Sequence, residues 1–396
     1  MKIVHLFKDA YPPLVAGITR YISDLASEFA RRGDEVSVVV AGVRTGRIDE
    51  DVDGVRIVRC AEWTRALSMP ISPALARAAR HHQADVLHVH MPNPIGEWGV
   101  MRRGGTTPYV ATFHAQLGKQ RLLAPFYRPL QRSIIANASS VFVSSDALAT
   151  SNELEPALRN NTLNVLPFGV SPKLIGARAT ADSQPQDVSR RGLRVLFVGR
   201  LVYYKGIDVL LDALEQLPEM TLTVVGEGVL GPMLGARSQS GTLAGRVDWK
   251  HDVDDEGLRS IYADHDVFVL PSVSRAEAFG LAMAEGMANG LAIISTRLNT
   301  GTDWVNEAGV TGLVVTPGDV GELTEALRTM ADNPARRAEM ARAAAVRAET
   351  YMSFQKHADA IASAYASAVA SVRSGNVSGP FVADRNAEST AIGEAA

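Results

Sequence analysis

The chain has 396 residues, which is long enough for two domains that each bury a core of their own. Its formal net charge is −3, so no global basic field indicates nucleic acid, and its 46% apolar and 21% charged residues are typical of a soluble globular protein. The single cysteine, Cys60, excludes an internal disulfide and a cysteine-based zinc site and fits a reducing compartment. The N-terminal residues lack the apolar core of a signal peptide, and no apolar run is long enough to span a bilayer. These features predict a cytoplasmic α/β protein of two domains.

The first half of the chain alternates short apolar runs with amphipathic helical stretches. Residues 2–7 predict a strand, and residues 18–33 predict a helix that ends at Gly33. The apolar face of that helix carries Ile18, Tyr21, Ile22, Leu25 and Phe29. Further β-branched runs predict strands at residues 35–42, 54–60, 84–90, 109–115 and 139–145. Unbroken apolar strands separated by helices indicate a parallel sheet covered on both faces.

The same pattern restarts after a polar segment without periodicity at residues 176–192, which we interpret as a linker. Strands are then predicted at residues 193–200, 222–228, 266–272, 291–296 and 312–315. The expected domains are therefore residues 1–175 and residues 193–353, and a donor can occupy the strand-end loops of one domain and an acceptor those of the other. A helix at residues 354–373 follows, and the small polar residues 374–396 predict a disordered tail. The predicted fold is two doubly wound Rossmann-like domains that face each other across a cleft.

In open parallel sheets ligands bind beyond the carboxyl ends of the strands, and the densest group of candidate residues lies at such an end. The strand at residues 266–272 leads into a loop with Glu277, and Phe279, Gly280 and Leu281 then open a helix. A helix N-terminus with a glycine in its first turn offers N–H groups and a positive dipole end to a phosphate. Glu285 lies eight residues after Glu277, just over two helical turns, and is expected on the same side. Two carboxylates that flank a diphosphate site predict binding of one nucleotide sugar.

The E-x7-E spacing of Glu277 and Glu285, together with FVGRLVYYKGID at residues 197–208, resembles the retaining family-4 glycosyltransferases of the GT-B fold. The resemblance extends from the first strand to the helix after Asn333. It implies that Arg200 and Lys205 hold the donor diphosphate, where cations stabilise the charge that grows as the bond breaks. Gly199 ends the strand before them.

The resemblance also assigns the other donor contacts. Glu277 is expected to bind hydroxyls of the donor sugar, and Glu285 the ribose diol. The N–H groups of Phe279, Gly280 and Leu281 are expected to reach the sugar and the diphosphate. The nucleobase is expected at residues 224–228, which include Gly226 and Glu227, and at residues 250–253. The helix at residues 354–373 is expected to cross back to the first domain, as in the family.

Two positions of the first domain complete the expected site. Residues 13–17 join the first strand to the first helix, where family members carry two adjacent glycines close to the donor phosphate. This chain has Ala16 and Gly17 there, so the backbone at the first of the two positions is less accessible to a ligand than it is with glycine. His114 ends the strand at residues 109–115 and matches the histidine that hydrogen-bonds the donor sugar in the family.

No metal site is predicted. Three D-x-D triplets, at residues 51–53, 252–254 and 264–266, either precede a strand or lie in a loop, and we interpret them as turn residues. His81, His82, His88 and His90 cluster in sequence without carboxylate or cysteine partners at ligand spacing. The nucleotide sugar is therefore expected as a co-substrate, with no cofactor and no metal.

The segment at residues 118–135 mixes basic with apolar side chains. Its basic residues are Lys119, Arg121, Arg128 and Arg132, and Arg102 and Arg103 lie nearby in sequence. Such a surface suits anionic headgroups of the inner membrane and a lipid-linked acceptor, and an ordinary helix with a solvated basic face explains it equally well.

The resemblance implies transfer of a hexose to a glycan or lipid-linked oligosaccharide in the synthesis of exopolysaccharide or O-antigen. The sequence GRLVYYKG at residues 199–206 is most similar to bacterial mannosyl- and rhamnosyltransferases, which favours GDP-mannose as the donor. UDP-glucose or UDP-N-acetylglucosamine is the alternative, and a nucleotide-sugar 2-epimerase of the same fold is a second one. Retention is expected through attack on the face that the diphosphate leaves, or through a short-lived covalent species.

Overall fold

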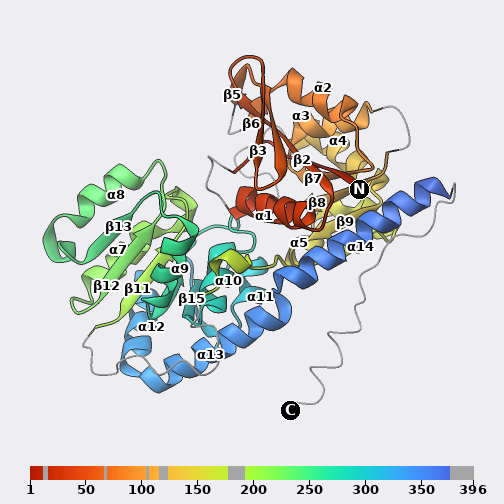
Figure 1. The fold of residues 1–396 in the computed structure, drawn as a ribbon. Coiled ribbons are helices and arrows are strands. Elements are labelled where there is room, and N and C mark those ends of the chain that lie inside the picture. The colour runs from red at the N-terminus through yellow and green to blue at the C-terminus, as the bar shows by residue number, and fades with distance from the viewer. Residues whose placement is uncertain (12–16, 67–68, 104–106, 116–123, 177–191, 375–396) are drawn as a thin grey trace, which may run out of the picture. The chain divides into compact units, whose positions relative to one another are not determined.

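The computed structural model describes residues 1–11, 17–66, 69–103, 107–115, 124–176 and 192–374. The chain divides into two compact units, Met1–Leu166 together with the segment that begins at His357, and Pro167–Lys356. In each unit a largely parallel sheet is covered by helices, as Figure 1 shows. Most of the predicted linker, residues 177–191, and the predicted tail from residue 375 lie outside the described residues. Among the helices that the structure describes, none combines the length and the apolar character needed to cross a bilayer.

The sheet of the first unit contains eight strands within the described residues. In their order across the sheet they are β10 (Leu163–Val165), β9 (Ser140–Val143), β8 (Tyr109–Phe113), β7 (Val86–Met91), β1 (Lys2–Leu6), β2 (Glu35–Val43), β4 (Val55–Ala61) and β3 (Arg47–Val52). All neighbours pair in parallel except β3, which forms an antiparallel hairpin with β4. The sequence analysis missed β3 because its residues are mostly polar and mostly exposed, with no buried run to mark a strand. A small hairpin of β5 (Thr64–Ala66) and β6 (Met69–Ile71) and the three-residue edge strand β10 were also not predicted.

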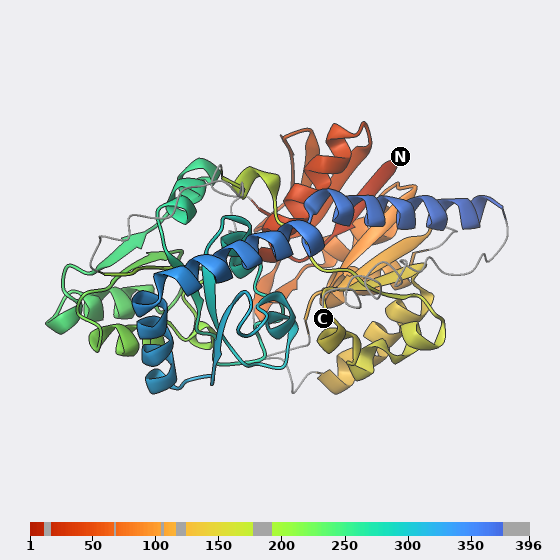
Figure 2. The same ribbon diagram turned by 90° about the horizontal axis from the view of Figure 1, so that it is seen from below.

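Alternate residues of these strands pack against two different groups of helices. Leu6, Leu87 and Phe113 belong to a core shared with α2 (Pro73–His81), α3 (Pro94–Met101) and α4 (Ala124–Asn137). The opposite face carries His5, His88 and His90, and α1 (Gly17–Arg31) and α14 (Phe354–Arg373) supply its aromatic and histidine partners. Figure 2 shows α14 running across the strands of this unit. The remaining short elements are α5 (Asp146–Ala149), η1 (Asn152–Leu154) and α6 (Glu155–Arg159).

The sheet of the second unit is parallel throughout its described strands. Their order is β13 (Val247–Lys250), β12 (Thr221–Val225), β11 (Arg194–Val198), β14 (Val267–Leu270), β15 (Ala292–Thr296) and β16 (Gly312–Val315). Five of these strands were predicted. The exception, β13, alternates between half-buried and exposed residues and sits at the edge of the sheet.

Helices cover both faces of this sheet too. Val195, Val267 and Ile294 share one core with α7 (Ile207–Glu215) and α12 (Val320–Asp332). Phe268 points the other way and lies against α10 (Leu281–Ala288), where a Cβ on Gly286 would come within 3.1 Å of the phenyl ring. Further helices are α8 (Gly231–Ser238), α9 (Asp255–Ala263), α11 (Gly301–Val305) and α13 (Pro334–Tyr351), and the 3₁₀ turns are η2 (Pro172–Leu174), η4 (Tyr203–Lys205) and η5 (Gly241–Leu243).

The first domain ends earlier than residue 175. The division of the chain falls after Leu166, and residues 167–176 pack with the second unit. Val170 donates its N–H to the Met352 carbonyl at 2.9 Å. The Asn289 side chain donates to the Leu174 carbonyl at 2.9 Å and accepts from the Gly176 N–H at 2.8 Å. Sequence reasoning placed the boundary at the start of the polar segment, whereas these hydrogen bonds to distant parts of the chain decide it.

Candidate active site

At the carboxyl ends of β11 and β12 the backbones of the two loops are in direct contact. Gly199 and Gly226 follow the two strands with φ of 155° and 133°, values that L side chains rarely adopt. A Cβ on Gly226 would lie 2.2 Å from the Gly199 carbonyl oxygen, so the close approach requires glycine. The Leu201 N–H donates to the Glu227 carbonyl at 2.8 Å, while the Glu227 side chain is exposed. The two predicted glycines thus allow the backbones of the two strand ends to come into contact.

The turn η4 carries Lys205 inward to the same edge of the sheet. Gly206 follows it with φ 65°, and a Cβ there would lie 2.1 Å from the Pro271 carbonyl oxygen. The Val273 N–H donates to the Tyr204 carbonyl at 2.8 Å, which ties the turn to the end of β14. As a result Lys205 is buried, although a lysine in a loop is ordinarily solvated.

Lys205 forms a buried ion pair with Glu277. The Nζ and Oε2 atoms are 2.5 Å apart, and the two side chains are only 11% and 10% exposed. The Ser272 hydroxyl also donates to Glu277 Oε2, at 3.1 Å. The sequence analysis assigned Lys205 to the diphosphate and Glu277 to the sugar, and it missed both their contact and Ser272. A strand–turn–helix pattern does not show which residues of two separate loops meet.

The start of α10 stands beside this pair. Gly280 caps the helix with φ 83°, and a Cβ on it would lie 2.9 Å from Leu270 Cδ2, so a larger residue is excluded by conformation and by space. Phe279 is buried and meets the Phe168 ring edge-on, with 5.2 Å between centroids. The Met283 N–H donates to the Gly280 carbonyl at 2.9 Å. The N–H groups that come before it at a helix start have no carbonyl of a preceding turn to bind, and with the helix dipole they suit an anion.

Glu285 lies on the same helix and is held by a tyrosine that the sequence analysis did not single out. The Tyr262 hydroxyl, on α9, donates to Glu285 Oε2 at 2.7 Å. The glutamate is half buried. Its carboxylate is therefore oriented before any ligand arrives, which lowers the entropy lost on binding.

Arg200 completes the candidate residues of the second unit. It is exposed directly after Gly199, and its side chain has no carboxylate within ion-pair distance among the residues that the structure describes. An exposed guanidinium without a carboxylate partner is suited to a bidentate contact with phosphate.

In the first unit, His114 is buried directly after β8. Its N–H donates to the Met91 carbonyl at 3.0 Å, and its Nε2 lies 3.0 Å from His90 Nδ1. Burial, followed by the nearby His357, lowers the pKa of His114 to about 3, so the ring is neutral near pH 7. Gly17 is the exposed first residue of α1, and residues 13–16 of the predicted loop lie outside the described part of the chain.

Several features set aside in the sequence analysis have structural roles. Asp51 and Val52 are the last two residues of β3, so the first D-x-D triplet overlaps the end of one strand as well as preceding another, which corrects its predicted position. Asp254 caps α9 by accepting from the Gly257 N–H, and Asp266 pairs with Arg194 at 3.0 Å. Nitrogen atoms of His5, His88 and His90 lie within 4.8 Å of one another, whereas His81 and His82 lie at the end of α2 and are not part of that group.

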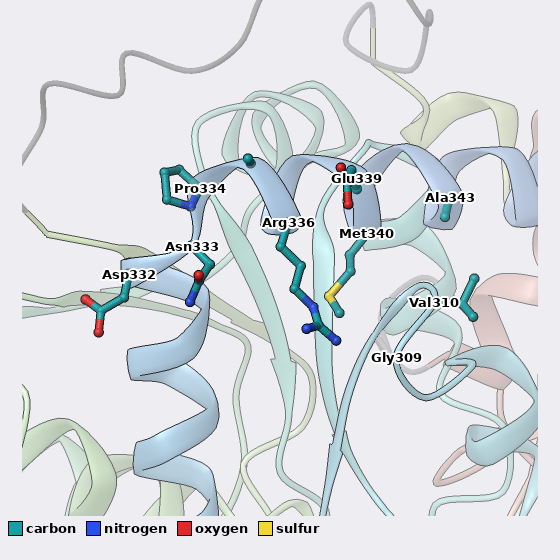
Figure 3. Close-up of a pocket in the computed structure, with 10 residues that line it drawn as sticks. Gly309, Val310, Asp332, Asn333, Pro334, Arg336, Glu339, Met340 and Ala343 are labelled. Carbon is teal, nitrogen blue, oxygen red and sulfur yellow. The ribbon is translucent and has the colours of Figure 1, made fainter.

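A hollow of about 760 Å³ occurs elsewhere in the second unit. It is lined by Gly309, Val310, Asp332, Asn333, Pro334, Ala335, Arg336, Glu339, Met340 and Ala343. Figure 3 shows the Arg336 and Met340 side chains on the same side of α13 as the loop that holds Gly309 and Val310. None of the candidate donor-binding residues lines it, so its size does not make it the active site.

Two Rossmann-like units in one chain, with cations, carboxylates and a glycine-capped helix at the strand ends of one of them, define the class of GT-B glycosyltransferases. Comparison with known families agrees. A model described as "Glycosyl transferases group 1" matches residues 180–347, and one described as "Glycosyl transferase 4-like domain" matches residues 16–167.

Relatives and solved structures extend the match over most of the chain. A phosphatidyl-myo-inositol mannosyltransferase of Mycobacterium tuberculosis is 30% identical over 72% of this chain and 74% of its own length. An O-antigen chain mannosyltransferase C of Escherichia coli is 28% identical, over 84% of this chain and 89% of its own. Sucrose-phosphate synthase from Thermosynechococcus elongatus superposes with a TM-score of 0.75 at 22% identity, over 93% of this chain and 99% of its own. The structure of Anabaena HepE in complex with UDP-glucose superposes with a TM-score of 0.70 at 21% sequence identity, over 93% of this chain and 100% of its own. The chain belongs to the group 1 glycosyltransferases, a retaining family.

Proposed function

We propose that this glycosyltransferase moves mannose from GDP-mannose to a glycan or lipid-linked oligosaccharide acceptor in cell-surface polysaccharide synthesis. The names of two relatives support this choice, since one is an O-antigen chain mannosyltransferase and the other a phosphatidyl-myo-inositol mannosyltransferase. The observation that carries the proposal is the buried Lys205–Glu277 pair beside the start of α10. A buried ion pair costs desolvation free energy, and a site for an anionic sugar donor is a reason to keep one.

In the proposed reaction the bond between the sugar and the diphosphate breaks first. Arg200, Lys205 and the N–H groups at the start of α10 stabilise the negative charge that grows on the diphosphate. The acceptor hydroxyl attacks from the face that the diphosphate leaves, and a departing phosphate oxygen takes its proton. Glu285 holds the ribose diol, and Glu277 holds hydroxyls of the sugar. Two cations and a helix end can supply the positive charge that a metal ion supplies elsewhere, so the proposal needs no metal.

Glu285→Ala is expected to weaken GDP binding about 10- to 100-fold, because the carboxylate makes charge-assisted hydrogen bonds to the ribose hydroxyls. Calorimetry with GDP and with UDP, both in EDTA, measures this. Tyr262→Phe keeps the carboxylate but loses the 2.7 Å hydrogen bond that orients it, so a smaller loss is expected. Glu349→Ala, which removes an exposed glutamate of α13, is the control and is expected to bind GDP like the wild type.

The outcomes separate the parts of the proposal. Binding of UDP without GDP would overturn the GDP-mannose donor and favour UDP-glucose, the donor bound in the HepE structure. Binding of neither nucleotide would overturn the assignment of Glu277 and Glu285. Turnover of a UDP-sugar without an acceptor would indicate the epimerase alternative.

We also propose that the first unit touches an anionic membrane surface while it acts on a lipid-linked acceptor. Of the basic residues named for this surface, Lys119 and Arg121 lie outside the described part of the chain. Arg128 pairs with Glu153 at 3.6 Å, Arg132 pairs with Glu155 at 2.6 Å, and Arg103 donates to the Ala79 carbonyl at 3.1 Å. Exposed apolar side chains remain, with Phe126 84% exposed on α4 and Trp98 48% exposed on α3.

Phe126→Ser is therefore expected to reduce sedimentation with phosphatidylglycerol vesicles several-fold, because an exposed aromatic ring supplies apolar area for the interface. Trp63→Ser removes another aromatic side chain of the same unit, 78% exposed, and serves as the control. Equal sedimentation of wild type and Phe126→Ser would contradict this contact.

A further inference from the structure

Three buried histidines of the first unit are connected in series. His5 Nδ1 lies 3.0 Å from His90 Nε2, and His90 Nδ1 lies 3.0 Å from His114 Nε2. The ring planes differ by 9° in the first pair and by 23° in the second, with centroids 5.3 and 5.2 Å apart. These centroid separations equal the N···N distance plus the two ring radii, so each hydrogen bond runs nearly in line with both rings. The three rings form a wire of imidazoles that ends at the residue assigned to the donor sugar.

The wire exists because of strand periodicity and parallel pairing. His88 and His90 alternate onto one face of β7, and His5 of β1 is the register partner of His88. His114 follows β8, where its N–H continues the pairing with Met91 of β7. The sequence analysis noted His88 and His90 but not His5 or the link to His114, although the alternation in HVH at residues 88–90 predicts a shared face.

All members of the wire are uncharged near neutral pH. Burial lowers the pKa of His5 to about 3 and the pKa of His90 well below its ordinary value. A neutral imidazole carries one N–H and one bare nitrogen. The two hydrogen bonds must therefore run in the same direction along the wire, from His5 to His114 or from His114 to His5.

The end of the wire at His5 decides the direction. His5 Nε2 is buried and has no hydrogen-bond partner among the described residues. If the bonds ran from His114 to His5, then Nε2 of His5 would carry a proton, and a buried N–H would lack an acceptor permanently. Orphaned buried N–H groups are rare in proteins. His114 Nδ1, at the other end of the wire, is also buried and makes no hydrogen bond within the described part of the chain. It follows β8 at the strand end where the proposed sugar would accept from it, and no such acceptor is proposed at His5, so the opposite direction is favoured. In that direction His5 donates to His90, and His90 donates to Nε2 of His114.

We propose that His5 and His90 are positioning residues that fix His114 as the neutral tautomer with its proton on Nδ1, so that it offers a hydrogen-bond donor to an oxygen of the sugar. This rests on the proposed function and on the hydrogen bond to the donor sugar that the sequence analysis expects of His114. A donor of fixed orientation costs no reorganisation when the substrate binds, which is the advantage of a preorganised site. It also rejects a substrate group that can only donate at that position.

The same histidines do not form a ready metal site. Both nitrogens of His88 are engaged, Nδ1 with the Tyr365 hydroxyl at 2.6 Å and Nε2 with the Thr112 hydroxyl at 2.7 Å. His5 and His90 use nitrogens of their own for the bond between them. An ion bound by all three would have to break these hydrogen bonds. We therefore assign the cluster to proton placement.

The direct test is the tautomer itself. The full-length protein labelled with ¹⁵N-histidine is examined by long-range ¹H–¹⁵N correlation, and His114 is assigned from its missing signals in His114→Ala. The expected pattern is a protonated Nδ1 and an unprotonated Nε2, unchanged from about pH 8 to about pH 6. Protonated Nε2, or a charged ring, would overturn the inference. So would a stoichiometric metal ion in the purified protein that His5→Ala removes.

Variants of His90 test the positioning. In His90→Asn the amide lies near the place of Nδ1, so it can still donate to His114, and both the tautomer and kcat are expected to be largely kept. In His90→Gln the amide lies nearer the place of Nε2, so about a tenfold loss of kcat and a mixed tautomer at His114 are expected. His88→Gln, on the same face of β7 but outside the wire, is the matched control and should leave the tautomer of His114 unchanged.

Two failures can be told apart. Equal effects of His90→Asn and His90→Gln on the tautomer would overturn the positioning role and leave the proposed reaction intact. Wild-type kinetics of His114→Ala would overturn the role of His114 in donor binding, and with it the use that we assign to the wire.

Discussion

Replacing Glu277 with glutamine is expected to lower kcat on the order of a hundredfold, and Lys205→Met is expected to do the same. Each change removes a charge that we assign to the donor, and each leaves the partner buried without its counter-ion, since both side chains are about one-tenth exposed. Breaking a buried pair from one side also destabilises the fold by roughly 3–5 kcal/mol. Steady-state kinetics and urea unfolding of the same samples measure both effects.

The double variant Lys205→Met/Glu277→Gln separates catalysis from stability. Without either charge no uncompensated ion remains, so the double variant is expected to be more stable than the sum of the single losses predicts, by about 1–3 kcal/mol. Its activity is expected to stay at the level of the worse single variant. Recovery of activity together with stability would show that the pair is only structural and would refute its role in the reaction.

Acidification is expected to destabilise the first unit steeply below about pH 6.5. Burial lowers the pKa values of His5, His88, His90 and His114 in the folded state, while the same rings titrate near 6.5 when the chain unfolds. The unfolded chain therefore binds more protons in this window. Stability is full above pH 6.5 and falls as the pH approaches the folded-state pKa values, by up to roughly 1.4 kcal/mol per pH unit for each histidine.

One carboxyl group opposes this trend. Burial raises the pKa of Glu97 to about 7, where it accepts hydrogen bonds from the Tyr127 hydroxyl and the Asn93 N–H. Its folded-state pKa is above the unfolded one, so its contribution grows as the pH falls from about 7 to about 4.5. Four histidines outweigh one glutamate, and a net loss of roughly 4 kcal/mol per pH unit is expected once the pH is well below 6.

Urea midpoints between about pH 7.5 and pH 5 measure this loss. His88→Gln removes one titrating ring. The free energy of unfolding of this variant is expected to be lower at neutral pH. It is also expected to fall less steeply with pH, because unfolding takes up about one proton fewer. An unchanged slope in this variant would mean that His88 is already charged in the folded state, contrary to the pKa direction that burial imposes.

The order of strands and helices was largely readable from the chain, because buried parallel strands require unbroken apolar runs and amphipathic helices require their own period. The strands that were missed are the edge strands β3, β10 and β13 and the small hairpin of β5 and β6. The residues of β3 and β13 are exposed or half-buried and carry no such pattern, and β5, β6 and β10 have only three residues each. The boundary near residue 175 was misplaced because Asn289 and Met352, far along the chain, hold residues 170–176.

The sequence by itself determined which residue types stand at the strand ends, since the spacing of Gly199, Arg200 and Lys205, and that of Glu277 and Glu285, is a local property. Only the tertiary structure decided which of them meet. Three contacts join separate elements of the fold. They are the ion pair of Lys205 with Glu277, the hydrogen bond from Tyr262 to Glu285, and the wire from His5 to His114. Such contacts depend on strand register and helix packing, and the free energy of burying a charge or an imidazole acts only once those elements have come together.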